Sequence, residues 1–117
     1  MTPLGLKIRE LRNRKGVTLK EMAAALDVSS AYLSALEHGR RGRPNRIQVQ
    51  RICEYFNIIW DDAEELERLA ALSHPRVTVD TAGLGADATE LANRLAQVIR
   101  KLPPAKIERL LSELKNP

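Results

Sequence analysis

Residues with special chemistry are scarce in this sequence. One cysteine cannot form an intramolecular disulfide, which suits a reducing compartment. Aromatic residues make up 3% of the chain, and the two histidines, His38 and His74, are isolated from each other. No glycine-rich phosphate loop, metal-spaced Cys/His set or nucleophile elbow is present. We therefore predict no catalytic residue, no metal, no cofactor and no enzyme.

Long hydrophobic runs are also missing. No apolar segment approaches the roughly 20 residues needed to span a bilayer. The first 15 residues carry charges before any continuous apolar segment, so we expect no secretory signal. These absences predict a cytoplasmic protein without membrane contact.

Charge is unevenly distributed along the 117 residues. Residues 1–60 contain 11 Lys/Arg and 5 Asp/Glu, whereas residues 61–117 contain 8 and 10. A basic first half suits a polyanion such as nucleic acid, and an acidic remainder suits protein contacts. A solvated surface with a chance imbalance explains the same numbers.

The stretch 17–39 organises the chain. Two short apolar-periodic segments, 19–26 and 30–38, are joined by Asp27, Val28 and Ser29. Thr18 and Glu21 form a capping-box pattern, Ser29 is the expected cap of the next helix, and Gly39 is suited to end it. This layout predicts a helix-turn-helix whose second helix, 29–38, enters the major groove of DNA.

A preceding helix is expected over 3–15, ended by Gly16. The segments Gly5–Arg12, Gly16–Thr18, Met22-Ala23, Val28-Ser29 and Tyr32–Gly39 together resemble the phage-repressor-like (Cro-type, XRE) helix-turn-helix family, over residues 4–60. The resemblance implies a compact five-helix domain that binds double-stranded DNA sequence-specifically as a dimer. It also implies that Arg12 pairs with Glu37 and ties the first helix to the recognition helix.

Two positions depart from the family pattern: Leu19 replaces a frequent Gln, and Asp27 replaces a frequent Gly. The positions expected to read bases are poor in bidentate donors, and specificity is expected to depend partly on water or DNA shape. These base-reading candidates are Ser30, Ala31, Tyr32, Ser34 and Ala35.

A basic loop follows the recognition helix. Its arginines are expected near phosphates or a minor groove, although a solubilising loop is the simpler alternative. The candidates for contact with the DNA backbone or minor groove are Thr18, Lys20, Ser29, Arg40, Arg41, Arg43, Asn45 and Arg46.

Two more helices are expected over 46–56 and from about 61 to 72. Cys53 falls on the inner face of the first and is predicted to be a small buried thiol. The run from Asp61 to Glu64 resembles another capping box, and Trp60 is expected to anchor its helix to the core. Residues 73–86 break the helical pattern and are either an ordered linker or, at Val77–Val79, a short strand.

Two amphipathic helices are predicted within 87–117, separated by Pro103-Pro104. Their apolar stripes must pack against residues 1–72 or against a second chain, and we favour packing against a second chain. The predicted dimerisation residues are Leu91, Leu95, Val98, Ile99, Leu102, Ile107, Leu110, Leu111 and Leu114. The predicted architecture is all-α: a DNA-binding domain at 1–72, a linker at 73–86 and a dimerisation segment at 87–117.

The leading hypothesis is a homodimeric, nucleoid-associated transcription regulator, and more specifically a repressor. One alternative is an antitoxin that represses its own operon and binds a toxin through its C-terminal part. Another is a helical adaptor that binds protein without DNA. For the regulator, control by its own concentration or by a regulatory protein partner is expected.

Overall fold

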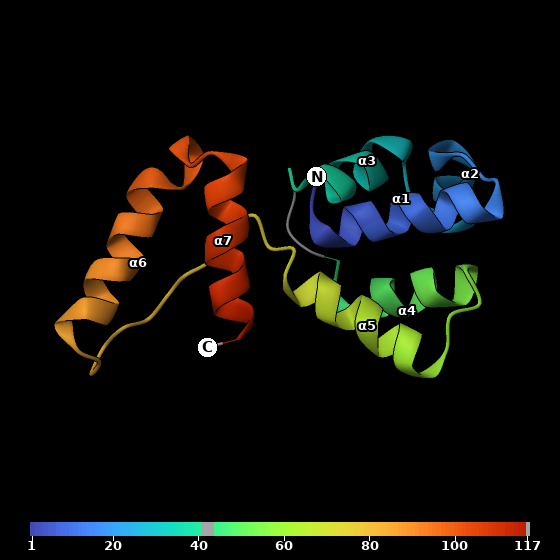
Figure 1. The fold of residues 1–117 in the computed structure, drawn as a ribbon. Coiled ribbons are helices and arrows are strands. Elements are labelled where there is room, and N and C mark those ends of the chain that lie inside the picture. The colour runs from blue at the N-terminus through green and yellow to red at the C-terminus, as the bar shows by residue number, and fades with distance from the viewer. Residues whose placement is uncertain (41–43, 117) are drawn as a thin grey trace. The chain divides into compact units, whose positions relative to one another are not determined.

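The computed structural model describes residues 1–40 and 44–116. The described chain is helical without a strand, which confirms the all-α prediction (Figure 1). The residues from Val77 to Val79 have no regular secondary structure, so the short strand considered above is not formed in this chain. In chain order the helices are α1 (Pro3–Lys15), α2 (Leu19–Ala25), α3 (Ser30–His38), α4 (Arg46–Tyr55), α5 (Trp60–Ala71), α6 (Ala86–Val98), the 3-10 helix η1 (Ile99–Lys101) and α7 (Pro104–Lys115).

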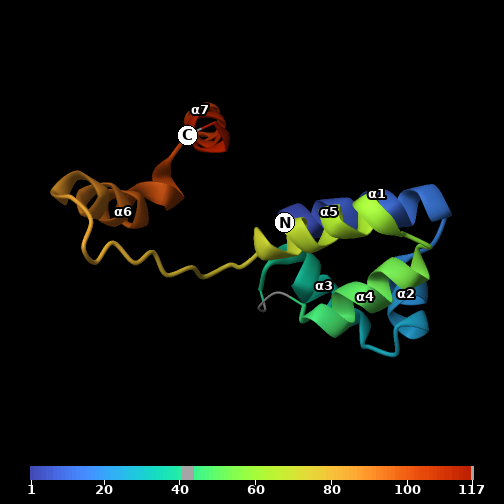
Figure 2. The same cartoon turned by 90° about the horizontal axis from the view of Figure 1, so that it is seen from below.

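The chain divides into two compact units, Met1–Val77 and Thr78–Pro117. In the first unit, α1 packs against both α3 and α5, α2 packs on α3, and α4 packs on α5. Figure 2 shows the same five helices gathered around a common interior. The first unit therefore has the five-helix arrangement that the family resemblance implies.

The ends of the first three helices follow the predicted cap chemistry. The hydroxyl of Thr18 accepts from the Glu21 backbone N–H at 3.0 Å, and the Glu21 carboxylate accepts from the Thr18 N–H. Ser29 caps α3 by accepting from the backbone N–H of Tyr32 at 3.0 Å. Gly16 and Gly39 end α1 and α3 in the left-handed conformation, at φ 73° and 72°. These local predictions are confirmed.

A single hydrophobic core holds the first unit together. Every one of its five helices contributes, and the residues that lie in it are Leu4, Ile8, Met22, Ala23, Leu26, Leu33, Leu36, Val49, Ile52, Cys53, Leu66 and Ala70. The predicted burial of Cys53 is confirmed. Burial of its thiol, with the nearby Glu67 and Glu54 carboxylates adding to the effect, raises the pKa of Cys53 above its ordinary value.

The prediction for the start of α5 is wrong. Trp60 is 81% exposed and does not anchor the helix, whereas Ile58, Ala63 and Leu69 pack against the core. Helix α5 begins at Trp60 with Ile59 at the cap position, and no side chain accepts a hydrogen bond there. Asp61 therefore lies inside the first turn, where its charge favours the helix dipole, and not at a capping box.

The second unit consists of α6, η1 and α7. Pro104 occupies the first turn of α7, as predicted, but η1 replaces the last turn expected of the preceding helix. Neither α6 nor α7 contains a buried residue. Among the described residues, no helix is both long and apolar enough to cross a membrane.

Candidate nucleic-acid interface

Helices α2 and α3 form the predicted helix-turn-helix. The turn between them depends on Asp27, whose φ of 56° allows the chain to reverse direction, and its N–H bonds to the Ala24 carbonyl at 3.1 Å. Asn and Asp tolerate this left-handed conformation better than most other residues. Val28 packs against the core from inside the turn, and Ala23 is buried on α2. The small side chain of Ala23 permits the close packing of α2 on α3.

A buried ion pair fixes α3 against α1. The Arg12 Nη2 atom lies 3.0 Å from Glu37 Oε1, and the two side chains are 11% and 1% exposed. Two atoms of the pair, Arg12 Nε and Glu37 Oε2, have no hydrogen-bond partner. Because each charge is withdrawn from water, loss of either partner would leave the other charge buried and unpaired. Arg12 and Glu37 therefore orient the recognition helix.

The backbone at the other end of α1 also meets α3. The Thr2 N–H donates to the Glu37 carbonyl at 3.0 Å, and a Cβ placed on Gly5 would lie 2.1 Å from the same oxygen. Only glycine permits this approach without moving one of the two helices. The angle at which α3 is presented thus depends on backbone contact as well as on the Arg12–Glu37 pair.

The predicted base-reading residues divide by exposure. Ser30 and Ala31, in the first turn of α3, are exposed, whereas Tyr32, Ser34 and Ala35 are half-buried. His38 is exposed and its Nδ1 lies 2.9 Å from the Ser34 carbonyl oxygen, so its ring is held against the last turn. The first turn of α3 is therefore the most accessible part of the predicted reading surface.

Three of the predicted phosphate-contacting residues are helix caps. The side-chain oxygens of Thr18, Ser29 and Asn45 accept from backbone N–H groups, with the Asn45 bond to Gln48 measuring 2.8 Å. These oxygens are engaged in forming the starts of α2, α3 and α4. Lys20, Arg40 and Arg46 are exposed cations. The remaining two candidates, Arg41 and Arg43, lie outside the described residues.

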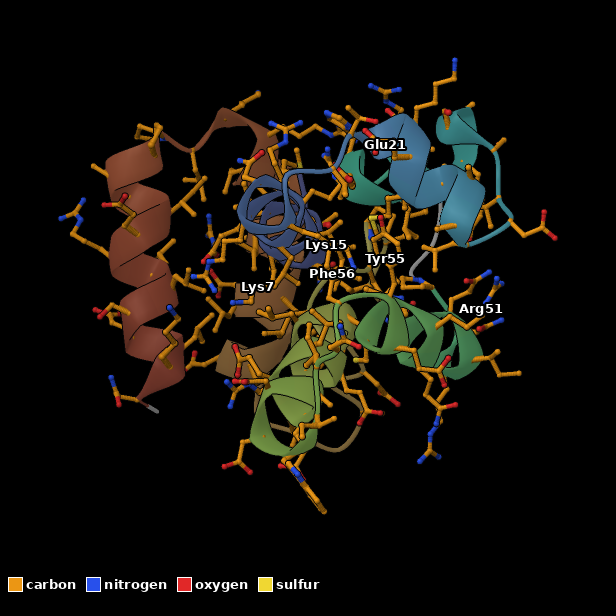
Figure 3. All side chains as sticks on the ribbon, turned by 90° about the vertical axis from the view of Figure 1, so that its right-hand side faces the viewer. Lys7, Lys15, Glu21, Arg51, Tyr55 and Phe56 are labelled. Atoms are coloured by element: carbon orange, nitrogen blue, oxygen red, sulfur yellow. The ribbon has the colours of Figure 1, made fainter. Side chains whose placement is uncertain are left out.

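Several positioning residues carried no simple sequence signal. The Arg51 guanidinium of α4 donates to the Leu26 carbonyl at the end of α2 and so supports the turn of the motif. Lys15 donates to the Tyr55 carbonyl at 2.8 Å, and its Nζ lies 4.4 Å from the centre of the Tyr55 ring. Figure 3 shows Lys15 beside Tyr55 and Phe56, where the end of α1 meets the end of α4. These contacts join segments 25 and 40 residues apart, which local patterns do not reveal.

The described residues contain no group of three or more His, Cys, Asp or Glu side chains placed to hold a metal ion. Cys53 is also poorly suited to bind a metal or to act as a nucleophile, because its thiol has a raised pKa and is buried. What the site offers is a fixed helix with an accessible first turn and neighbouring cations. That combination fits contact with a polyanion.

Comparison with known proteins adds independent evidence. The chain is 29% identical over 62 residues to the HTH-type transcriptional regulator RghRB of Bacillus subtilis, and these residues are 53% of this chain and 45% of that protein. It is 37% identical over 59 residues to the HTH-type transcriptional regulator DdrOP3 of Deinococcus deserti, covering 50% and 45%. It is 30% identical over 61 residues to the HTH-type transcriptional repressor RghR of Bacillus subtilis, covering 52% and 45%.

The matched residues span about half of this chain and a little less than half of each of these relatives. No solved structure matches the chain significantly. The model of the helix-turn-helix domain family matches residues 3–72, the segment that contains all five helices from α1 to α5. The chain therefore belongs to the helix-turn-helix domain family.

Proposed function

We propose that this chain is a sequence-specific, DNA-binding transcription regulator. The observation that carries the proposal is the presentation of α3: one side is locked by Arg12 and Glu37, while Ser30 and Ala31 at its start are exposed. Recognition helices of this motif contact base edges through their first residues. Three relatives named as transcriptional regulators or repressors support the same proposal.

In this proposal the base contacts come from α3 and the phosphate contacts from the residues around it. Ser30 and Ala31 supply a hydroxyl and a methyl group in the major groove, with Tyr32, Ser34 and Ala35 at the margin of that surface. The exposed cations Lys20, Arg40 and Arg46, together with Arg41 and Arg43, supply backbone attraction. Most of the affinity then comes from phosphates, and modest direct readout is supplemented by DNA shape.

We further propose that the chain acts as a homodimer on an operator with two-fold symmetry. Two half-sites bring two copies of α3 to successive turns of the major groove. The binding energy is then roughly twice that of a single α3, whose own base contacts are few. The apolar residues of α6, η1 and α7 are the proposed dimer contacts. Occupying an operator in this way represses transcription when the site overlaps a promoter.

Selection of bound sites from random DNA tests the function. We expect a recurring site with two related halves, and a purified, folded chain that enriches no site would contradict the proposal. Ser30→Ala then shifts the base preference at one position of each half-site while leaving non-specific binding unchanged. Its matched control is Ser112→Ala, since Ser112 is also an exposed helical serine but lies on α7.

Salt dependence tests the phosphate contacts. Arg46→Ala weakens binding to specific and random DNA alike and reduces the slope of log affinity against log salt by about 1 for each chain. The control is Arg68→Ala, which removes an exposed arginine from α5. Equal slopes for the two variants would remove Arg46 from the interface.

A further inference from the structure

The chain leaves the first unit at a point where the ends of three helices meet. The Leu4 N–H, in the first turn of α1, donates to the buried Ser73 hydroxyl at 2.9 Å, and this hydroxyl donates to a carbonyl in the last turn of α5. The Thr2 N–H, just before α1, bonds to the Glu37 carbonyl of α3. Figures 1 and 2 both show the C-terminal end of α5 beside the N-terminal end of α1. Residues 73–77, which follow from this junction and end the first unit, are called the exit segment below.

The exit segment begins beside the end of the recognition helix. A Cβ placed on Gly39, which ends α3, would lie 2.9 Å from Thr2 Cγ2 and 4.0 Å from the Pro75 Cβ. Arg40 follows Gly39, and Arg76 follows Pro75, each with its Cα only about 3.8 Å further along the backbone. Two arginines that are far apart in the sequence therefore follow two residues that lie side by side at the end of α3.

The charge at this edge of the first unit has one sign. Residues 39–46 and the exit segment together contain five arginines and no Asp or Glu. Arg40 and Arg76 are both exposed, and neither forms an ion pair with any residue that the structure describes. Arg68, by contrast, pairs with a glutamate of its own helix. A guanidinium without an internal carboxylate is available to an external anion, and its planar fork fits a phosphate.

The exit segment is accessible but its start is fixed. Pro75, Arg76 and Val77 are exposed and belong to no helix or strand. An exposed segment attached to the edge of a helix-turn-helix variant can extend its contact with DNA beyond the recognition helix. Because the hydrogen bonds of Ser73 hold the start of the segment, less freedom is lost when Arg76 binds a ligand.

We propose that the exit segment is a DNA-contacting arm, in which Arg76 binds a backbone phosphate beside the half-site occupied by α3. This inference rests on the proposed function, because it places the phosphate next to the end of a recognition helix that lies in the major groove. Arg40 and Arg76 then hold the same stretch of backbone from two separate segments of the chain. A phosphate contact carries no sequence information, so Arg76 adds affinity and fixes the position of α3 without reading a base.

The salt dependence of DNA binding tests the arm in the full chain. Arg76→Ala should weaken binding to the selected site and to random DNA alike, and should reduce the slope of log affinity against log salt by about 1 for each chain. The matched control is Arg68→Ala, which removes the same charge from an exposed position of α5 and should leave the slope unchanged. Equal slopes for the two variants would overturn the proposal.

A cleavage probe tests where the arm lies on the DNA. Arg76→Cys in a Cys53→Ala background allows iron-EDTA to be attached at residue 76, and Arg68→Cys in the same background is the control. We expect the probe at residue 76 to cut the selected site within a few nucleotides on one flank of each half-site. Cutting that is no stronger or more localised than from residue 68 would overturn the proposal.

Failure of the arm is distinguishable from failure of the proposed function. A parent chain that selects no site from random DNA contradicts both proposals. A parent chain that selects a site, with Arg76→Ala behaving like Arg68→Ala, contradicts only the arm. Circular dichroism of each variant checks that the fold is unchanged, which is expected because both arginines are exposed.

Discussion

The two units of this chain are both helical, yet different forces hold their helices. In residues 1–77 each helix contributes side chains to one core, and Leu4, Ile8 and Leu66 are at most 1% exposed. In residues 78–117 the helices have apolar stripes of similar length without a buried residue. Both units thus contain amphipathic helices, but only in the first unit do other helices of the same unit cover the apolar faces.

The largest expected contrast is between two ion pairs. Arg12→Ala leaves the Glu37 carboxylate buried without its partner and should lower the free energy of unfolding by about 3–5 kcal/mol. Arg94→Ala removes an exposed partner of Glu90 and should change the free energy of unfolding by less than about 1 kcal/mol. Urea unfolding followed by circular dichroism measures both.

A double variant sharpens this contrast. Replacing Arg12 and Glu37 together by methionines should restore most of the stability, because no buried charge remains. We expect the same double variant to lose operator discrimination, since α3 is then less firmly oriented. Stability that is not recovered would mean that the pair contributes net energy and not only orientation.

Glycine substitutions should give the next largest difference. Gly5→Ala forces α1 away from the Glu37 carbonyl and should cost about 1–3 kcal/mol, measured as a fall in thermal midpoint. Gly85→Ala, in the second unit, places its Cβ in open space and should cost at most about 0.5 kcal/mol. Equal losses would mean that α1 can shift without disturbing its packing.

Helix starts provide a smaller contrast. Thr18→Ala removes a complete capping box and should destabilise the first unit by about 1 kcal/mol. Gly85→Ser adds a hydroxyl where α6 has no side-chain cap and should stabilise that helix by a few tenths of a kcal/mol. Thermal melts of the fragment ending at Val77 and of the full chain separate the two effects.

Thiol reactivity compares the solvent exposure of one cysteine in each unit. Burial raises the pKa of Cys53, so the native chain should react slowly with an alkylating reagent at neutral pH and faster only once the first unit unfolds. A cysteine introduced as Ser112→Cys on exposed α7, in a Cys53→Ala background, should react at the rate of a model thiol. Mass spectrometry over time measures both rates, and rapid labelling of native Cys53 would show that the core opens readily.

Local chemistry made the first unit largely predictable. Thr18, Ser29, Gly16 and Gly39 specify where helices begin and end through hydrogen bonds to neighbouring backbone, and such short-range signals are readable in a sequence. The family resemblance added the pairing of Arg12 with Glu37, which no periodicity reveals. By contrast, the bond from Arg51 to the Leu26 carbonyl depends on how α4 meets α2, and nothing local encodes it.

Trp60 shows why an apolar residue is not always a core residue. Its size suggested burial, but the neighbouring Ile58 packs against the core, while Trp60, at a positive φ of 55°, is 81% exposed. Hydrophobicity predicts that a side chain prefers to be covered, while the volume left by its neighbours decides whether it can be. The same limit applies to the candidate interface, where sequence indicated which residues could face DNA but not which are half-buried.

In the proposed function, the acidic residues of α5 affect how the first unit approaches DNA. Figure 1 shows α1 lying between α3 and α5, and the exposed carboxylates of α5 include Asp61, Asp62, Glu64 and Glu67. Helix α5 therefore carries a concentration of exposed negative charge. A molecule of this kind experiences a torque in the field of a polyanion, and encounters that begin with α5 forward are turned or repelled before contact. In the proposed function, these carboxylates raise the fraction of productive collisions without touching DNA.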